Sequence, residues 1–233
     1  MYYKLSNNFA VNDIEESQGL KFKFPDAFES KPIIDGLNEE ILPVVTNQRQ
    51  DVVEFAIWGL LPQNFKEDWS VFQNTGNTLN MSVASVLESE IYSEVLLQRR
   101  CCILVSGFFA SYYFDGEVFP IYVYPENQKY FALAGIYNKT DDGFITTTLL
   151  LRRANAHMSR LHNISNRMPI VLCSENMQHW LNNGYSTIVY DEVDDFDNLN
   201  MKSHTIAKEF YKNNIVFDSI LNPVEYKNLT FNY

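Results

Sequence analysis

The sequence predicts an α+β fold, a single strand-rich domain over residues 1–233 in which mixed and antiparallel β-sheets form a barrel-like core with short flanking helices. Short apolar runs of strand length, separated by turn residues, recur along most of the chain. One long segment shows the three- and four-residue apolar spacing of an amphipathic helix. A hydrophobic content of 46% supplies a substantial core, and no repeat or low-complexity linker marks a domain boundary.

The first part of the chain is expected to hold three strands, at residues 2–5, 42–46 and 52–61. The second and third are joined by a tight polar turn at residues 48–51. Between residues 12 and 40 any long element is interrupted by Pro25, Pro32 and Gly36. After the third strand, Asn74, Gly76 and Asn77 predict a loop.

The long amphipathic helix follows Asn80 and runs to about Gln98. Its expected buried face consists of Val83, Val86, Leu87, Ile91 and Val95. Arg99 and Arg100 fall in the last turn, where positive charge is favoured by the helix dipole.

The remaining chain is expected to continue as strands at residues 101–105, 130–137, 144–151, 170–172 and 187–190, with an aromatic hairpin at 107–124 that turns at Asp115-Gly116. Short helices are expected at 175–181, with Ser174 as N-cap, and at 205–212. Asp191–Asp197 contains five acids in seven residues and is interpreted as a solvated loop, with a metal site as the less favoured alternative.

Residues 154–172 concentrate candidate site residues. Met158 and Leu161 suit the buried face of a short helix, and His162 then lies at its C-terminal end, where the dipole favours a protonated imidazole. After a polar turn, Arg167-Met168-Pro169 leads into the strand at 170–172. The pattern therefore delivers a histidine and an arginine to the end of a rigid strand. In the alternative interpretation, His162 caps the helix and Arg167 pairs with an acid.

Composition limits the class of protein. The net charge of −11, from 18 basic and 29 acidic residues, disfavours tight nonspecific binding to nucleic acid but leaves room for a local basic groove. The chain has neither a run of roughly 20 apolar residues nor an apolar N-terminal leader, which predicts a soluble cytoplasmic protein without a membrane partner. Cys101, Cys102 and Cys173 are expected to be buried thiols. No spacing of Cys and His indicates a zinc site, and no metal or cofactor is expected.

Several segments, in order and spacing, resemble the SRAP family, the abasic-site processing proteins once named SOS-response-associated peptidases. The segments are Leu42-Pro43-Val44-Val45, Trp58-Gly59-Leu60-Leu61-Pro62, Asn80, Arg100-Cys101 through Gly107-Phe108-Phe109, Phe119-Pro120-Ile121-Tyr122, Ala134-Gly135-Ile136-Tyr137, Ala154-Asn155, and His162 through Arg167-Met168-Pro169-Ile170-Val171-Leu172. They cover nearly the whole chain.

The resemblance implies a chemistry and a partner. Family members carry a cysteine directly after the initiator methionine. Once the methionine is removed, the α-amine and the thiol capture the ring-opened aldehyde of an abasic site in single-stranded DNA. The amine forms an imine, the thiolate closes a thiazolidine ring, and water is lost. An asparagine, a glutamate and a histidine surround this cysteine, orient the sugar and move protons.

Carried over by position, the resemblance implies two catalytic residues, Asn80 and His162. It also implies contacts to nucleic acid from Arg167, from Lys4, which keeps a positive charge where the family has arginine, and from Arg152, which adds one.

The other functional positions depart from the family pattern. Tyr2 replaces the cysteine, Ala110 the glutamate and Ser111 the aromatic after it. After the asparagine, where the family usually has an arginine and an acid, this chain has Met81-Ser82-Val83-Ala84. Ser93 replaces a second arginine of the helix, and Asn64 and Phe65 stand where the family often has tryptophans. A phenol has a pKa near 10 and cannot close a thiazolidine. Methionine aminopeptidases also spare Met before a bulky residue. We therefore expect a chain that has lost the crosslinking chemistry and retains at most binding of nucleic acid or of a protein partner.

Three alternatives remain open. In the first alternative, the amine of Met1 forms a Schiff base with an abasic aldehyde, assisted by Asn80 and His162, and the strand is then cleaved. In the second alternative, Cys101 or Cys102 serves a peptidase-like activity, although a buried thiol is normally inert. In the third, the chain is a protein-interaction module that uses exposed aromatics at residues 112–114. For these aromatics the hairpin pattern favours packing on the sheet.

Overall fold

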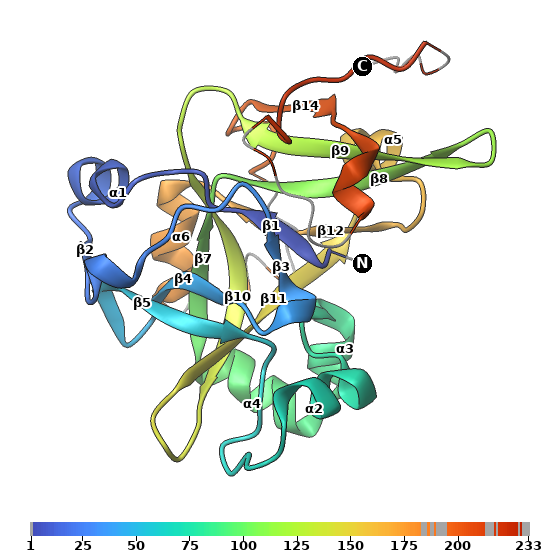
Figure 1. Ribbon diagram of the computed structural model, residues 1–233. Helices are drawn as coiled ribbons and strands as arrows, with labels where there is room; N and C mark the ends of the chain where they lie inside the picture. Colours follow the sequence, from blue (N-terminus) through green and yellow to red (C-terminus); the bar gives the residue numbers. More distant parts are fainter. Residues whose placement is uncertain are drawn as a thin grey trace.

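Two β-sheets carry the fold in the computed structural model, which describes residues 2–182, 186, 189, 195–212, 217, 219–227 and 229. In Figure 1 one sheet lies across the top of the molecule and the other forms its centre. The strand-rich α+β architecture predicted from the sequence is confirmed.

The central sheet closes on itself. Its strands are hydrogen-bonded in the order β5 (Arg49–Trp58), β4 (Ile41–Thr46), β7 (Arg100–Val105), β10 (Phe131–Lys139) and β11 (Ile145–Arg153). The start of β11 then pairs in parallel with the end of β5, with Ile145 opposite Ala56. The strands therefore form a closed ring with a single parallel seam, which is ring-like and not a regular barrel.

Strand β7 shows why the ring holds together. Cys101, Ile103 and Val105 point into one apolar cluster, and Cys102 and Leu104 point into a second cluster on the other face. All five side chains are fully buried. A strand covered on both faces reads as a continuous apolar run, which is the pattern from which this strand was predicted.

Strand β11 organises the rest of the sheet, because both of its edges are paired along its length. One edge takes β10 and then β12 (Arg167–Pro169); the other takes β5 and then β6 (Asn80–Ser82). Strand β13 (Val171–Leu172) pairs with β10, and β2 (Lys21–Phe22) pairs with β5. The segments that carry Asn80 and Arg167 are thereby attached to the same end of one strand.

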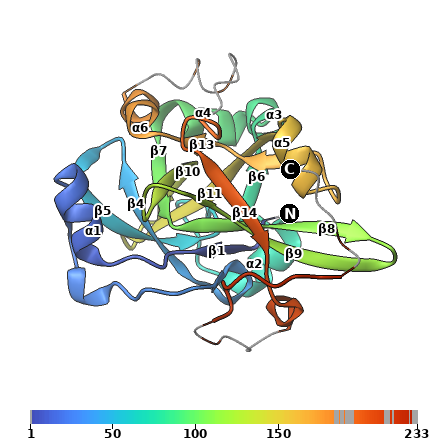
Figure 2. The same cartoon turned by 90° about the horizontal axis from the view of Figure 1, so that it is seen from above.

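The second sheet has the order β14 (Met201–Thr205), β9 (Glu117–Pro125), β8 (Gly107–Phe114), β1 (Lys4–Ser6) and β3 (Ile34–Asp35). The predicted β8–β9 hairpin turns at Asp115 and Gly116, with φ of 49° and 80°. These positive φ values suit Asp and Gly in a two-residue hairpin turn. Figure 2 shows the hairpin extending beyond the body of the molecule.

Helices cover one side of the ring. α6 (Ser174–Leu181) and α4 (Glu90–Gln98) pack against β7 and β10, and α3 (Val83–Glu88) lies beside β6 and β11. The fully buried Arg100 joins two of them: its guanidinium donates to the carbonyls of Leu96 and Leu97 at the end of α4 and of Trp180 and Leu181 at the end of α6. Arg99 and Arg100 were expected in the last turn of this helix, but α4 ends at Gln98, and Arg100 brings its positive charge to the helix C-terminus from β7. Within the part of the chain that the structure describes, no helix is both long and apolar enough to cross a membrane.

The long helix predicted after Asn80 is interrupted. Residues 80–82 form β6, and the helical part breaks at Ser89, whose φ of −93° and ψ of 124° are extended. The hydroxyls of Ser82 and Ser89 each cap a separate helix by accepting a backbone N–H. The break rotates the second helix, so that Ile91 is 74% exposed and Leu96 is buried in its place.

The predicted loop at residues 74–77 is also wrong, because these residues end a helix, α2 (Trp69–Gly76). The Asp68 carboxylate caps its start, and Asn77, at φ 34°, ends it in the left-handed region. The buried Trp69 indole donates to the carbonyl of Trp58 at 3.2 Å and so holds the helix on the ring.

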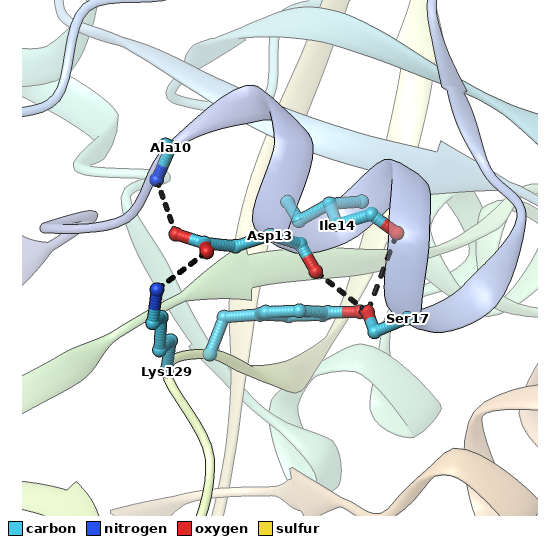
Figure 3. A network of polar contacts seen from close by, with 6 residues as sticks. Ala10, Asp13, Ile14, Ser17 and Lys129 are labelled. Carbon is cyan, nitrogen blue, oxygen red and sulfur yellow. Dashed lines mark hydrogen bonds and ion pairs between the residues drawn. The ribbon is translucent and has the colours of Figure 1, made fainter.

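Residues 11–38, predicted only as a broken region, contain a further helix, α1 (Val11–Gln18), and the 3₁₀ turns η1 (Pro25–Ala27) and η2 (Gly36–Asn38). Figure 3 shows how α1 is held. The Asp13 carboxylate accepts the N–H of Ala10 at 2.8 Å and the ammonium of Lys129 at 2.6 Å. The Ser17 hydroxyl lies 2.5 Å from the hydroxyl of Tyr130.

Toward the C-terminus two expectations are corrected. The helix predicted at 205–212 is a short 3₁₀ turn, η3 (Lys208–Tyr211), and strand β14 precedes it. Helix α6 starts after Cys173, so Ser174 is its first residue and not its N-cap. The carboxylate of Asp195 holds this start of the helix by accepting the backbone N–H of Cys173 at 2.8 Å and the side-chain NH2 of Asn176.

Asp195 is fully buried, so this part of the acidic run is not a solvated loop. Cys173 is partly exposed, in contrast to the expectation of three buried thiols. The rest of the acidic run up to residue 194, and three of the four residues of the strand predicted at 187–190, lie outside the described residues.

Candidate functional site

The side chain of Tyr2 occupies the centre of the candidate site. It is 1% exposed, and its ring packs edge-on against Phe108, at 5.8 Å between centroids, and against the imidazole of His162, at 5.2 Å. Its hydroxyl donates a 2.9 Å hydrogen bond to the carbonyl oxygen of Arg167. An aromatic ring thus fills the position at which the resemblance requires a thiol.

The environment of Tyr2 keeps its phenol protonated. Burial raises the pKa of this hydroxyl far above its ordinary value of 10. It donates a hydrogen bond to the carbonyl of Arg167, which stabilises the protonated form. Tyr2 is therefore a neutral, packed side chain and does not supply a nucleophile.

His162 is held by hydrogen bonds at both ring nitrogens. Nδ1 lies 3.1 Å from the backbone nitrogen and 3.0 Å from the carbonyl oxygen of Ser111, and Nε2 lies 3.1 Å from the Ser165 hydroxyl. Burial lowers the pKa of the imidazole, and the hydrogen bond to Ser111 acts in the opposite direction without reversing the shift. Burial thus favours the neutral imidazole, whereas the dipole of the short helix α5 (Ala156–Leu161) was expected to favour the protonated one.

His162 also has a structural role that it shares with Asn163. Strand β1 covers the edge of β8 only as far as Phe108. Farther along that edge, His162 binds the backbone of Ser111, and the Asn163 amide accepts the N–H of Tyr113 at 2.7 Å and donates to its carbonyl at 2.8 Å. Two side chains thereby replace a strand on the β8 edge. Sequence analysis missed Asn163, because its partner lies 50 residues away.

Asn80 faces the same core as Tyr2. It lies on β6 opposite Leu149, a member of the cluster that contains Tyr2. Both polar atoms of its side-chain amide are buried, and neither has a hydrogen-bond partner among the described residues. No hydrogen bond joins Asn80 to His162 within that part of the chain. A buried amide without a partner costs about 1–3 kcal/mol, so a ligand or water is expected there.

The arginines lie at the end of β11. Arg167 on β12 is directly opposite Arg153 on β11, and Arg152 is opposite Met168. Arg153 is exposed and Arg167 is half-buried. No carboxylate of the described residues forms an ion pair with either, so the alternative in which Arg167 pairs with an acid finds no support there. Two like charges placed opposite each other on paired strands are unfavourable unless an anion lies between them.

Lys4 is engaged inside the protein. Its ammonium lies 3.4 Å from the carboxylate of Asp35, donates to the carbonyl of Phe210 at 2.9 Å and lies over the Phe210 ring. The side chain is 16% exposed. Its contact with nucleic acid stays a prediction, and the geometry does not favour it.

The thiols of β7 do not form a second nucleophilic site. Cys101 and Cys102 are fully buried, and Cys101 lies 3.2 Å from the hydroxyl of Thr147. Burial raises the pKa of Cys101 to about 12 and that of Cys102 well above its ordinary value. Over the described residues, no group of three His, Cys, Asp or Glu side chains is placed to hold a metal ion.

The aromatics of the β8–β9 hairpin divide into two kinds. Tyr112 packs against the core, as expected. Tyr113 is 54% and Phe114 42% exposed, and there the expectation of packing on the sheet is wrong, because the hairpin extends beyond the layer beneath it. Ile164, next to the Asn163 that binds Tyr113, is 51% exposed. The hairpin end and the loop after α5 therefore each present exposed apolar side chains.

Comparison with known proteins agrees with the resemblance drawn from the sequence. A family model described as SOS response associated peptidase (SRAP) matches residues 8–212. The abasic site processing protein YoqW of Bacillus subtilis is 26% identical over 151 residues, which is 62% of this chain and 64% of that protein. The abasic site processing protein YMR114C of Saccharomyces cerevisiae is 22% identical over 227 residues, covering 94% of this chain and 60% of the relative. The chain thus spans less than two thirds of the length of these relatives.

Two solved structures share the fold. A protein from Bacteroides thetaiotaomicron superimposes with a TM-score of 0.82 at 21% sequence identity, covering 96% of this chain and 100% of that one. A protein from Bordetella bronchiseptica superimposes with a TM-score of 0.68 at 11% identity, covering 88% and 99%.

Proposed function

Because the chain belongs to the SRAP family, we propose that it binds single-stranded DNA reversibly, including strands with abasic sites, and does not form the thiazolidine crosslink. The names of its relatives support abasic sites as the substrate class, and the single-stranded form follows from the family resemblance. We also propose that residues 1–233 act as one domain. The cytoplasmic location expected from the sequence stays a prediction.

One observation carries the proposed loss of chemistry, namely the burial of the Tyr2 ring against His162. Thiazolidine formation needs an amine and a thiol on the same residue. Here that residue carries a neutral phenol whose oxygen is committed to the carbonyl of Arg167. The position of the family glutamate is occupied by Ala110, which is fully buried and has no side-chain group that can transfer a proton. Ring closure then has no thiol to perform it, and proton transfer lacks the carboxylate that the family places beside the histidine.

The proposed binding face is formed by Arg153 and Arg167 with the exposed aromatics of the hairpin end. A phosphate between the two arginines relieves their repulsion, because Arg presents a fork of donors to phosphate oxygens. Stacking of a base on an exposed aromatic side chain contributes about 1–3 kcal/mol without requiring a particular sequence. The small number of arginines predicts weak, strongly salt-dependent binding.

The test uses fluorescein-labelled 20-nucleotide DNA, intact or with one central abasic site, followed by anisotropy and by a denaturing gel. Wild type is expected to bind both strands reversibly, to lose affinity as salt rises, and to leave no adduct on the gel. Arg153→Gln combined with Arg167→Gln should reduce affinity at least about tenfold at low salt. A denaturation-stable adduct with wild type contradicts the proposed loss of chemistry, and wild-type affinity in the double variant contradicts the binding face.

A gain of function provides the matched comparison. Tyr2→Cys with Ala110→Glu restores a thiol and a carboxylate, and Tyr2→Ala with Ala110→Glu removes the ring without supplying the thiol. We expect an adduct with abasic DNA only from the first pair. If both pairs form it, an amine alone is responsible.

A second candidate function is favoured by Asn80, whose buried amide has no partner among the described residues. Such a group is suited to receive a sugar hydroxyl. In this alternative the amine of Met1, which lies outside the described residues, attacks the aldehyde carbon, a Schiff base forms with loss of water, and the strand is cleaved. Borohydride trapping on abasic DNA tests it. A trapped product that disappears in Asn80→Ala supports the alternative, and no product, or one unchanged in that variant, excludes it.

A further inference from the structure

A groove on the uncovered side of the ring has no role in the function proposed above. It lies beside β5, at the point where the pairing of this strand with β2 ends and its pairing with β11 begins. The residues that line it include Phe24, Ile41, Phe55, Ile57 and Phe144. This part encloses about 460 Å³. A second hollow of about 360 Å³ continues from it, shares Ile57 and Phe144, and is lined further by Phe65 and Trp69. We call the two together the β5 groove.

Exposed apolar side chains gather at the rim of the β5 groove. Phe24 is 57%, Ile41 43% and Phe144 59% exposed. Ile41 and Ile57 are opposite each other on the paired strands β4 and β5, so the floor of the groove is a sheet face. Helices α3, α4 and α6 pack against β7, β10 and β11, on the other side of the ring in Figure 1. The apolar rim is therefore uncovered, and an uncovered apolar patch of this kind is typical of a binding surface.

The charges around the β5 groove indicate what it binds. Three lining carboxylates, Glu39, Glu67 and Asp142, have no ion pair with any Lys or Arg of the described residues. The lining cation Lys23 is already neutralised, because its ammonium lies 2.8 Å from the carboxylate of Glu54. Lys66 is the remaining cation of the lining. The groove thus combines an apolar floor with an excess of unpaired negative charge.

We propose that the β5 groove binds a segment of a partner protein in which an aromatic or branched apolar side chain is flanked by Lys or Arg. The apolar side chain enters the hollow between Ile41, Ile57 and Phe144. The flanking cations pair with Glu39 and with the acids of the second hollow. Complementary charge of this kind selects the partner and accelerates its association.

A second copy of this chain is a poor occupant. Its own groove would bring the same carboxylates against Glu39 and its neighbours, and two chains of net charge −11 repel each other. Nucleic acid is excluded for the same reason, because its phosphates would face these acids. The proposal does not depend on the chemistry at Tyr2, since the groove and that site share no residue.

The test is selection of peptides from a random dodecapeptide phage library on the full-length wild-type chain. Counter-selection uses the variant Ile41→Ser/Phe144→Ser, which changes only exposed side chains and is expected to fold. Binding of the enriched peptides, synthesised with a fluorescent label, is then measured by anisotropy as a function of salt. Ile91→Ser on α4 is the matched control, because Ile91 is 74% exposed and lies outside the groove.

We expect the enriched peptides to carry an aromatic, Leu or Ile next to Lys or Arg. Their affinity should fall at least about tenfold in Ile41→Ser/Phe144→Ser and in Glu39→Lys, and should stay unchanged in Ile91→Ser. Acidic peptides, or peptides that bind all variants equally, overturn the proposal, as does a library that yields no groove-dependent binder. Sedimentation that shows a wild-type dimer lost in the double variant assigns the groove to a second copy instead and also overturns it. DNA binding is expected to be unchanged in the groove variants, so failure of this proposal leaves the proposed function standing.

Discussion

Tyr2 gives the sharpest prediction of the structure, because a residue next to the chain end is expected to matter as much as one in the middle of the core. Terminal residues of most domains are poorly ordered and tolerate change. Tyr2 is instead 1% exposed, packs against Phe108 and His162, and donates its hydroxyl to the carbonyl of Arg167. Two substitutions separate its contributions: Tyr2→Phe removes the hydroxyl, and Tyr2→Ala removes the ring as well.

The magnitudes follow from these contacts. A typical buried hydrogen bond contributes about 0.5–1.5 kcal/mol, so Tyr2→Phe should lower the free energy of unfolding by about 1 kcal/mol. Truncation of a fully buried aromatic side chain to Ala costs about 3–5 kcal/mol, since the lost transfer free energy is increased by the cavity that remains. Tyr2→Ala should therefore remove a large part of a stability that is typically about 5–15 kcal/mol.

The assay is urea unfolding followed by circular dichroism, with intact-mass spectrometry to establish whether Met1 is retained in each variant. Tyr113→Ala is the matched control, because Tyr113 is 54% exposed and its bonds to Asn163 involve only the backbone of Tyr113. We expect that control to stay within about 0.5 kcal/mol of wild type. If Tyr2→Ala costs no more than Tyr113→Ala, the ring does not fill the site, and the argument that Tyr2 blocks crosslinking fails with it.

Three further predictions concern charged groups. Arg100→Met leaves the carbonyl ends of α4 and α6 without their buried donor and should cost about 3 kcal/mol or more in urea unfolding; wild-type stability would contradict this capping role. Asp195→Ala removes the buried acceptor of the Cys173 N–H and the Asn176 side chain at the start of α6 and should cost about 2 kcal/mol, with faster hydrogen exchange confined to that helix; exchange that rises uniformly would indicate a different role. The pKa of Asp13 is lowered chiefly by its hydrogen bond to Lys129. Because the pKa is lower in the folded than in the unfolded state, the stabilisation by the Asp13 carboxylate is present above about pH 4 and is lost as pH falls further. Asp13→Asn should therefore flatten the fall of the urea midpoint at acid pH, and an unchanged pH dependence would contradict it.

Local patterns were sufficient to predict the long strands and the hairpin, but not the short strands β2, β3, β6 and β12 or the strand β14. The Asp115-Gly116 turn follows from the φ values that these two residue types adopt easily, and the apolar run at 101–105 follows from burial on both faces of β7. The break of the long helix at Ser89 was not predicted, because the apolar spacing continues across this residue. The spacing gives no sign that the Ser89 hydroxyl caps a new helix.

What the sequence could not show depends on partners far apart in the chain. The imidazole of His162 was placed correctly at the end of its helix, but the burial that favours its neutral form depends on distant residues such as Ser111 and Tyr2. The hydrogen bonds of Asp195 at the start of α6 and the parallel seam between β5 and β11 are of the same kind. At position 2 the sequence showed that the thiol sulfur of the family is missing, and the structure shows that the buried ring of Tyr2 fills the site.

The attachment of the first strand has a consequence for synthesis on the ribosome. Tyr2 finds its hydrogen-bond partner 165 residues later, and Lys4 finds one 206 residues later. At about 5–20 residues per second, roughly 10–40 s pass between translation of Lys4 and translation of the carbonyl that it binds. The strand partners of β1 in β3 and β8 are translated earlier, so Leu5 can pair before then. The side chains of Tyr2 and Lys4 wait longest for their partners, and chaperones can act on the start of the nascent chain during that interval.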